Sequence, residues 1–506
     1  MSTFHGLEMA KQALYAQQSA LYTTGHNISN ANTEGYSRQR VNFNTMQPFP
    51  SGSRNRPQMP GQMGTGVEIG AIQRVRNNFL DYQFRAENSK SGYWDTRSDA
   101  LGRLEELLNE PSDSGLSKTM DQFWDSLQEL AANPDNSGAR SVVAHRGFAV
   151  AETFNHLSKS ITSMREDLQN QINVTTSDAN SLLRQINELN NQIKQVEPHG
   201  YVANDLYDDR DRLIDELSEI VNIKVKHDKT SDGAKDIADG IVSIELVDRN
   251  GQSMNSPPIM LLDGTARDQS KAVHELDVTY NDDGAVQSIS VEGYDRLEPL
   301  ALMESVGSLK GLIESYGYVD EDGDLTGEYP DMLAELDTLA AAFADEFNKV
   351  HRMGEEGDDA QNFFSYDETE GAAASLTVLK EIMDEPGLIN ASTDASSGSG
   401  DNALALADVF SEDLDELDGA TVNDFFGSLI GQLGVRAEKS NRMSQNSDVL
   451  RSQVEEQRMS VSGVSLDEEM SNMIKFQHAY SAAARSMTTI DEMIDRIINN
   501  MGLVGR

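Results

Sequence analysis

Residues 27–39, "NISNANTEGYSRQ", separate a helical pattern from the strand-like run that follows them. Asn30 and Asn32 have short side chains that can bond to the neighbouring backbone, and Gly35 accepts a positive φ without a steric penalty. Together with Tyr36, these residues predict a turn that ends the first helix. The purpose of this turn depends on the segments beside it and on the other end of the chain.

The helical pattern before the turn repeats every seventh residue, at Leu7, Leu14, Leu21 and Ile28. A second heptad pattern, near the C-terminus, alternates steps of four and three residues. Its apolar positions include Leu466, Met470, Met473, Tyr480, Met487, Ile494, Ile498 and Met501. Neither helix can bury its apolar stripe alone. We therefore expect the two ends to form a coiled coil that packs further against other copies of the chain, with an ordinary intramolecular bundle as the alternative.

The net charge of −43 is concentrated in the middle of the chain. Residues 1–100 sum to +3 and residues 436–506 to −1, so the segment between them carries −45. Neutral ends can pack together while acidic middles repel one another and stay hydrated. An acidic, soluble surface or a salt-adapted source is the simpler alternative. This charge argues against a nucleic-acid partner, because phosphate binding needs clustered lysine and arginine.

The sequence contains no cysteine, which excludes disulfides, thiolate metal sites and cysteine nucleophiles. Residues 1–20 have neither an uninterrupted apolar core nor a small-residue cleavage site, so we expect no cleavable secretory signal. No run of about eighteen apolar residues occurs, and we expect neither a membrane-spanning helix nor a membrane partner. If the chain is exported, an uncleaved signal must direct it.

Between its ends the chain is predicted to be a helical rod with one β insertion. Heptad-spaced apolar residues predict a helix from about residue 150 to 196, which ends before Pro198 and Gly200. Return helices are predicted over 330–351 and 421–461. These lengths suit a rod better than a compact enzyme.

Residues 221–300 alternate apolar and polar side chains and contain the turn signal Asn250-Gly251, which predicts a small, mostly antiparallel β domain. The fold class is therefore mainly α with an inserted β domain. We expect three parts: a terminal coiled coil of 1–45 plus 463–506, a rod of 46–220 plus 301–462, and the β domain of 221–300.

Five stretches carry a resemblance to a known family. "NISNANTEGYSRQ" resembles the motif shared by flagellar rod, hook and hook-associated proteins. Four others are similar to segments of the hook-associated family FlgK: "GTGVEIGAIQRVRNNFLDYQFRAEN" (64–88), "NDLYDDRDRLIDELSEIVNIKV" (204–225), "LAAAFADEFNKVHRMG" (339–354) and "SGVSLDEEMSNMIKFQHAYSAAARSMTTIDEMIDRIINNM" (462–501). Longer relatives carry a further outer domain, for which this sequence has no room.

The resemblance implies a structural protein of the bacterial flagellum, exported through the flagellar channel and assembled outside the cell as a ring that joins the hook to the filament. It also implies the partners: other copies of the chain, the hook protein, the next hook-associated protein toward the filament, and an export chaperone on the C-terminal helix.

Catalytic and metal-binding patterns are weak. None of the nine histidines has the H-x-x-x-H spacing, and neither a G-x-S-x-G nor a G-x-x-x-x-G-K-[ST] motif occurs. In "DEDGDLTGEYPD", 320–331, Asp320, Asp322 and Asp324 have calcium-loop spacing. Leu325, however, stands where an EF-hand needs glycine. We interpret this segment as a solvated acidic turn, and we expect no catalytic residue, no metal and no cofactor.

Two other functions remain open. A hook-like subunit would share the first motif, although it would not explain the long heptad helix or the segment 204–225. A secreted adhesin would bind host or matrix surfaces and would not need both termini together.

Overall fold

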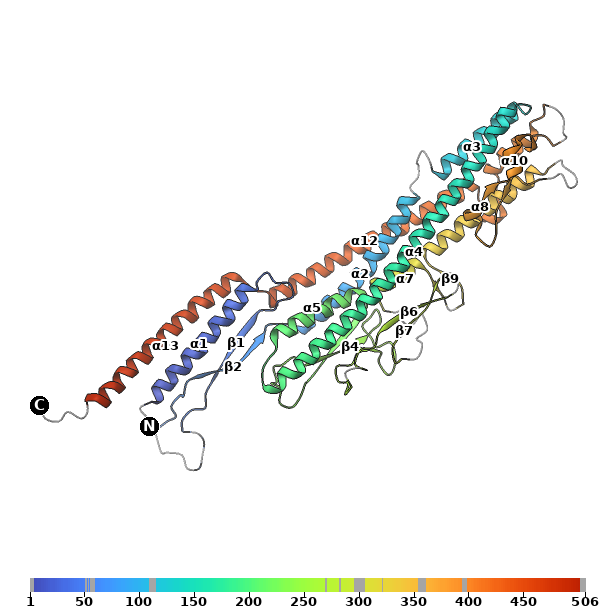
Figure 1. The fold of residues 1–506 in the computed structure, drawn as a ribbon. Coiled ribbons are helices and arrows are strands. Elements are labelled where there is room, and N and C mark those ends of the chain that lie inside the picture. Colours follow the sequence, from blue (N-terminus) through green and yellow to red (C-terminus); the bar gives the residue numbers. More distant parts are fainter. Residues whose placement is uncertain are drawn as a thin grey trace.

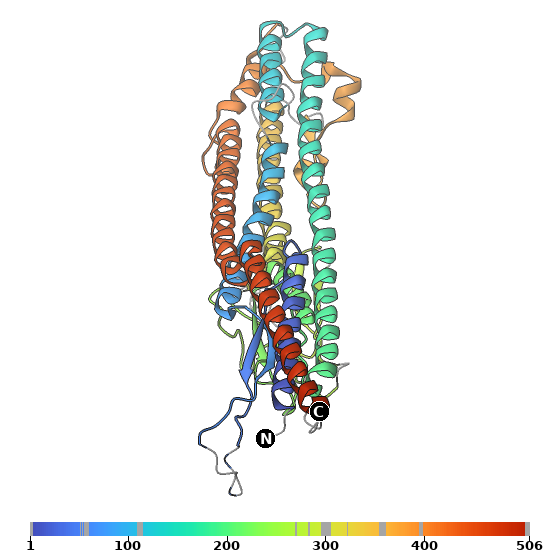
Figure 2. The same ribbon diagram turned by 90° about the vertical axis from the view of Figure 1, so that its left-hand side faces the viewer.

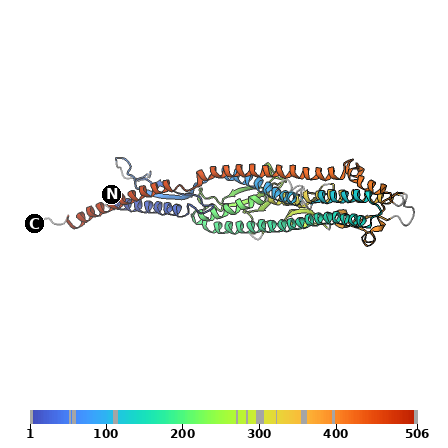
Figure 3. The same ribbon diagram turned by 90° about the horizontal axis from the view of Figure 1, so that it is seen from above.

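The structure is a computed structural model that describes residues 4–500 apart from 51, 53, 55–59, 109–114, 269–270, 282–283, 295–304, 321, 354–360 and 394–397. The molecule is elongated (Figure 1). Most of its length is a rod of helices with small sheets along one side. A narrower unit that contains both chain termini continues the long axis of the rod (Figure 3).

The longest element is α4 (Ser137–Val196), whose 60 residues make it about 90 Å long. Its start is capped by Asn136, whose side-chain oxygen accepts the N–H of Gly138 at 2.9 Å. It ends before Pro198, as predicted, and Gly200 follows with a φ of +81°. The helix begins earlier than residue 150, because the stretch before that residue buries Val143 and Ala144 against the rest of the rod.

Four further helices build the rod with α4: α2 (Asn78–Leu107), α3 (Leu116–Ala132), α8 (Glu328–His351) and α12 (Val422–Ser462). The last two confirm the predicted return helices. Shorter elements complete the rod: α5 (Asn204–Ile220), α7 (Ser308–Tyr316), α9 (Ala372–Ser375), α10 (Lys380–Asp384), α11 (Asp401–Asp408), β10 (Phe364–Ser365) and β11 (Thr377–Val378).

The β strands lie beside the rod in two small sheets (Figure 1). One sheet is antiparallel and contains β3 (Ile223–Asp228), β4 (Ile241–Leu246) and β5 (Met260–Leu262). The other contains β6 (Leu276–Tyr280), β7 (Val286–Val291), β8 (Tyr318–Val319) and β9 (Leu325–Thr326). This second sheet extends past residue 300, because α7 returns the chain so that Tyr318 pairs in parallel with Val286. The two-residue strands β8 and β9 are too short to show an alternating pattern in the sequence.

The terminal unit contains α1 (His5–Ser29), β1 (Gln39–Thr45), β2 (Val67–Arg74) and α13 (Leu466–Asn500). The two helices lie side by side in both views (Figures 1 and 2). They run in opposite directions, since Asn27 donates to Glu469 at 3.1 Å while a Cβ on Gly6 would lie 3.2 Å from Cδ1 of Ile490.

The two contacts are 21 residues apart on each helix, which is three heptads. The same step places Ala13 and Ala20 on α1 opposite Ala483 and Phe476 on α13. Gly6, Ala13 and Ala20 are small, so the two backbones can approach closely. The predicted coiled coil between the ends is therefore present, with a seam of small residues on α1.

The larger apolar residues of the predicted stripes lie beside this seam. Leu7, Leu14, Leu21 and Ile28 each follow a seam position by one residue and are half-buried. On α13, Met473 and Met487 are half-buried and Ile494 is buried, but four predicted positions are exposed: Leu466, Met470, Tyr480 and Ile498. Met501 lies outside the described residues. A single chain does not test contacts between copies, so these packing positions stay a prediction; within the chain, the residue beside Leu7 that meets α13 is Gly6.

At the far end of the rod, aromatic residues from several elements gather around Phe123 of α3. Its ring centroid lies 5.3 Å from that of Phe347 and 5.9 Å from that of Phe363. Gly147 of α4 allows the closest approach, because a Cβ there would lie 2.6 Å from the Phe363 ring. This cluster joins α3, α4 and α8.

Replacing Phe123 with Ala should lower the free energy of unfolding of the rod by about 3–5 kcal/mol, because the fully buried ring leaves a cavity. Trp124→Ala is the matched control, since the next side chain is 40% exposed, and it should cost less than about 1 kcal/mol. Urea unfolding followed by circular dichroism measures both. Equal losses for the two variants would contradict this account of the cluster.

Candidate functional site at the joint between the terminal unit and the rod

The turn predicted from residues 30–36 ends α1 and folds the chain back into β1. The side chain of Asn30 donates to the carbonyl oxygen of His26 at 3.1 Å, and its own Oδ1 accepts Thr33 Oγ1 at 3.2 Å. Gly35 has a φ of +77°, and a Cβ there would lie 3.3 Å from Cβ of Arg212 on α5. Asn32 is exposed. The turn therefore rests directly on the rod at Gly35.

Asn27, in the last turns of α1, is buried beneath this turn and stabilises it by hydrogen bonds. Its Oδ1 accepts the hydroxyl of Tyr36 at 2.8 Å and the backbone N–H of Gln39 at 3.0 Å. Its Nδ2 donates to the carbonyl oxygen of Gln39 at 2.8 Å and to Glu469 at 3.1 Å. Burial raises the pKa of the Tyr36 hydroxyl, and the nearby carboxylates of Asp205, Asp208 and Glu469 add to the shift, so the phenol stays a donor. One buried amide thus joins α1, β1 and α13.

Arg38 clamps the first turn of α13. Its Nε donates to Glu469 at 2.8 Å, and its two terminal nitrogens donate to Glu468 at 2.9 and 2.8 Å. Its backbone N–H donates to the carbonyl oxygen of Ser462, the last residue of α12, at 2.8 Å. Hydrogen bonds from Arg38 hold the pKa of Glu468 below its usual value. Arg38 therefore touches both helices at the point where the chain leaves the rod.

The segment also docks on α5. The backbone N–H of Ser37 donates to Asp208 at 3.1 Å, and the Gln39 side chain donates to Asp205 at 2.8 Å. Only residues 75–77 and 463–465 connect the terminal unit covalently to the rod. The turn and its neighbours supply a third, non-covalent connection, which we call the joint: residues 27–39, 205–212 and 462–469.

Directly behind the joint lies a buried network of arginine and aspartate side chains. Arg74 donates to Asp208 at 2.7 Å and to Asp211 at 2.9 Å, and Arg76 lies 3.2 Å from the same Asp211 oxygen. The other members are Asp81, Arg85, Asp215, Asp239 and, from α12, Arg458. Burial alone would raise the pKa of Asp211, but the surrounding arginines hold it well below its usual value. The network binds β2, α2, α5 and α12 together.

Sequence reasoning identified the turn but not its partners. Asn27, Arg38 and Glu469 come together from positions up to 442 residues apart, which no local pattern reveals. Among 84 acidic residues, close carboxylate pairs arise by chance, so the sequence alone does not single out the carboxylates of the network. The available signal was "DDRDR" at 208–212, where alternating charges stand on a helix face otherwise rich in buried residues.

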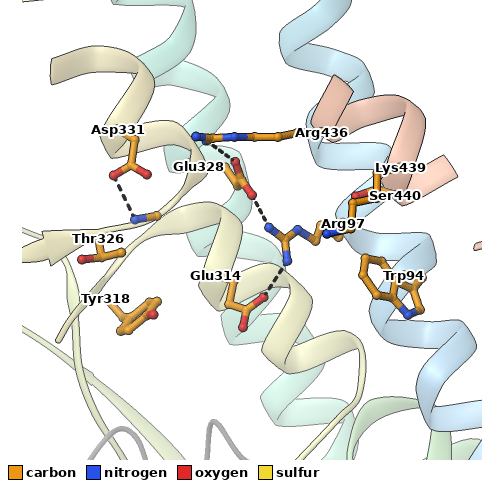
Figure 4. Close-up of a pocket in the computed structure, with 11 residues that line it drawn as sticks. Trp94, Arg97, Glu314, Tyr318, Thr326, Glu328, Asp331, Arg436, Lys439 and Ser440 are labelled. Atoms are coloured by element: carbon orange, nitrogen blue, oxygen red, sulfur yellow. Dashed lines mark hydrogen bonds and ion pairs between the residues drawn. The ribbon is translucent and has the colours of Figure 1, made fainter. Parts of the chain in front are cut away.

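A polar pocket of about 460 Å³ lies higher in the rod, between α2, α8 and α12 (Figure 4). Glu328 is buried there and accepts hydrogen bonds from Arg97 and, at 3.1 Å, from Arg436. Arg97 also reaches Glu314 at 3.2 Å. The ion pairs of Arg97 with Glu314 and Glu328, and of Arg436 with Glu328, therefore join α2, α7, α8 and α12 at this pocket.

The acidic segment 320–331 contains the turn between β8 and β9, strand β9 itself and the start of α8. Oδ1 of Asp320 accepts the backbone N–H groups of Asp322 at 3.0 Å and Asp324 at 2.8 Å, so this oxygen is used by the turn itself. Among the residues that the structure describes, no group of three His, Asp or Glu side chains is arranged to hold a metal ion. Across the same residues, no helix is both long and apolar enough to cross a membrane.

Replacing Arg38 with Ala should loosen α13 from the joint, since it removes the clamp and leaves the buried Glu469 carboxylate with only Asn27. We expect the amides of residues 466–480 to exchange hydrogen at least about tenfold faster, because loss of one partner of a buried charge costs several kcal/mol. Lys475→Ala, an exposed change on the same helix, is the control. Unchanged exchange in the Arg38 variant would rule out the clamp.

Replacing Asp211 with Asn should destabilise the base of the rod by about 3–5 kcal/mol at pH 7, because Arg74, Arg76 and Arg85 lose their shared carboxylate. Since the folded pKa is depressed, this contribution is complete above about pH 4 and is lost as the pH falls toward the lower folded pKa. The difference from the unsubstituted chain should therefore narrow below about pH 4. Urea midpoints at several pH values test this, with the exposed Asp125→Asn as control; a difference independent of pH would contradict it.

Comparison with known protein families agrees with this architecture. The model described as "Flagellar hook-associated protein FlgK helical domain" matches residues 101–364. "Flagella basal body rod protein" matches 7–36, and "Flagellar basal body rod FlgEFG protein C-terminal" matches 455–501. The last two matches fall on the two helices of the terminal unit.

Individual relatives extend the match to the whole chain. The flagellar hook-associated protein 1 of Bacillus subtilis (strain 168) is 46% identical over 516 residues, covering 100% of both chains. Its namesake from Salmonella typhimurium (strain LT2) is 24% identical over 582 residues, covering 97% of this chain and 98% of the relative. The solved structure of the flagellar hook junction protein FlgK from Burkholderia pseudomallei has a TM-score of 0.58 at 14% identity, over 75% of this chain and 100% of that one, and shares the fold. Because the helical-domain model covers more than half of the chain and the Bacillus relative aligns with all of it, the chain belongs to the FlgK family of flagellar hook-associated proteins.

Proposed function

We propose that this chain assembles outside the cell as a ring of identical copies between the hook and the filament of a bacterial flagellum. Its work is mechanical: it connects two tubes and carries no catalytic site. The names of its relatives support the position between hook and filament. The exposed apolar surface of the terminal unit supports assembly into a ring. The hook protein is the expected neighbour on one side, and the next hook-associated protein is the expected neighbour on the other.

The observation that carries the proposal is the set of large apolar side chains left exposed on the terminal unit. On α13, Met470 is 57% exposed and Ile498 is 66% exposed. The same surface includes Tyr15, Tyr22, Leu466, Ile474, Tyr480, Met493 and Ile497. The helix pair cannot cover them, because the face that each helix turns toward the other is already used in the contact between α1 and α13. Neighbouring copies would cover these residues in a closely packed ring.

The same exposed apolar surface is the reason to expect an export chaperone, because it must stay covered until the chain assembles outside the cell. An exposed apolar helix would associate non-specifically inside the cell, so we propose that an export chaperone binds α13 before the chain passes through the flagellar export channel. The absence of cysteine suits this route, since no disulfide has to form or break on the way.

Replacing Met470 and Ile474 with Glu tests the proposal. Both side chains are exposed, so the purified monomer should keep its helix content and its unfolding midpoint. In the ring the new carboxylates would be buried in apolar contacts, which costs several kcal/mol. We therefore expect cells that keep their hooks, lose their filaments and release filament protein into the medium.

Val174→Glu with Val435→Glu is the matched control, because it adds the same charge at two exposed apolar positions of the rod. Electron microscopy of the cells and swimming in soft agar provide the readouts. Normal filaments on cells with the α13 variant would refute the ring mechanism and would favour an adhesin, which does not depend on this surface.

A further inference from the structure

The hairpin of β1 and β2 extends from the joint as an arm (Figures 1 and 2). We define the hairpin arm as β1, β2 and the described residues of their connection: 46–50, 52, 54 and 60–66. Pairing continues beyond the two strands, since the N–H groups of Phe49 and Met63 donate to each other's carbonyl oxygens at 2.9 and 2.8 Å. The arm runs from the joint toward the end of the terminal unit, away from the rod.

The charge of the hairpin arm is opposite to that of the chain as a whole. From Gly35 to Val67 the sequence contains four arginines and no acidic residue, within a protein of net charge −43. Arg38 is held by Glu468 and Glu469. Arg40 and Arg54 are exposed, and neither has an ion pair among the described residues.

Apolar side chains accompany these arginines. Phe49 is 42% exposed and Met63, which pairs with it, is exposed as well, while Phe43 is 38% exposed although its ring packs edge-on against Phe476 of α13. Water hydrates the arginines but leaves the exposed apolar side chains of a two-stranded hairpin without a partner. The arm therefore has the composition of a contact surface: an apolar centre with cationic groups beside it.

A complementary surface lies on the other side of the joint. The outer face of α5 carries Asp205, Asp209, Glu216 and Glu219 at helical spacing, with Arg212 among them paired to Glu216, and we call this face the acidic ridge. A groove of about 550 Å³ separates its upper part from α12. Six carboxylates and three arginines line this groove, so its net charge is negative; the carboxylates are Glu34, Asp215, Glu216, Glu219, Glu455 and Glu456, and the arginines are Arg212, Arg451 and Arg458.

We propose that the hairpin arm of one copy docks on the acidic ridge of a second copy. This inference rests on the proposed ring. Within one chain, the root of the arm touches the ridge, because Gln39 donates to Asp205 at 2.8 Å, but from there the arm and the ridge extend in opposite directions along the long axis (Figure 1). A neighbour displaced along that axis by about the length of the arm brings the two surfaces together; the twelve residues from Gln39 to Pro50 reach at most ~40 Å.

Charge supplies the reason for this contact. Copies that each carry −43 repel one another, and close packing needs places where opposite charges meet. Within the part of the chain that the structure covers, Arg40 and Arg54 are cations without ion pairs, and Asp209 and Glu219 are anions without them. Such complementarity fixes the register between neighbours more than it adds affinity.

The absence of cysteine permits a direct test in assembled flagella. Arg54→Cys and Glu216→Cys are introduced together into the full chain, in flagellate cells whose own gene has been replaced. After mild oxidation of isolated hook–filament junctions, we expect dimers and longer disulfide-linked ladders on non-reducing gels. Each single variant, and Arg54→Cys combined with Ser428→Cys on the upper part of α12, serves as a control and should give monomers.

The second measurement reverses the charges of the two surfaces and reads out disulfide trapping. It uses a second cysteine pair, Gly52→Cys and Glu216→Cys. A Cβ on Gly52 would meet no atom within 4 Å, so the arm accepts a cysteine there. Arg40→Glu with Arg54→Glu should lower the trapped fraction by about tenfold. Asp209→Arg with Glu219→Arg should do the same, and the combination of both reversals should restore trapping to within about twofold of the starting level.

The outcomes separate the two proposals. Cells that bear filaments but yield only monomers, or a faster-migrating monomer from a disulfide within one chain, would overturn the arm contact and leave the ring intact. The same holds if charge exchange fails to restore trapping. Absence of the protein from isolated junctions, with filaments unaffected by its deletion, would instead overturn the proposed function.

Discussion

Two short segments of backbone, 75–77 and 463–465, are the only covalent connections between the terminal unit and the rod. A mechanical load along the molecule must therefore pass through the joint. Side-chain contacts there have to fix the angle between the terminal unit and the rod. Asn27, Arg38 and Glu469 do this with directional hydrogen bonds between groups that are largely shielded from water. Because these bonds tolerate little change in distance or angle, the terminal unit leaves the rod in one direction. Every contact that a neighbouring copy makes depends on that direction.

The buried network behind the joint has the same role at a larger scale. Replacing paired charges by apolar groups often leaves a protein as stable or more stable, so stability alone does not explain why Arg74, Arg76, Asp208 and Asp211 are buried together. Apolar contacts would let β2, α2, α5 and α12 slide past one another with little change in energy. Ion pairs with fixed geometry prevent this. The distant aromatic cluster around Phe123 can stabilise the rod by apolar packing. The ion-pair network at the base of the rod fixes how its helices and strand are oriented.

The sequence predicted the elements of this molecule better than their contacts. Heptad patterns predicted much of α4, both terminal helices and α8, because amphipathic periodicity is a local property. The contact between α1 and α13 was expected along Leu7 and its successors, since large apolar residues give the strongest signal. Gly6 and Asn27, whose contacts with α13 the structure shows, carry no such signal, and only a second helix lying against them reveals their role. The joint could not be derived either, because Asn27 and Glu469 meet across nearly the whole chain, and short strands such as β8 have no periodicity to detect.

The packing of α1 and α13 also shows how one helix can serve two partners. A helix that buried its leucines and methionines inside a single chain would be self-sufficient and would offer little to a neighbour. Here glycine and alanine bring the two backbones of one chain close together, and this close approach turns larger residues such as Leu7 toward the flanks and Met470 and Ile498 outward. The inner seam needs only shape, because the joint already fixes the register through Asn27 and Glu469. In the proposed ring, the exposed apolar side chains of the outer surface, such as Met470 and Ile498, are the ones that neighbouring copies would cover, so assembly would complete the terminal unit.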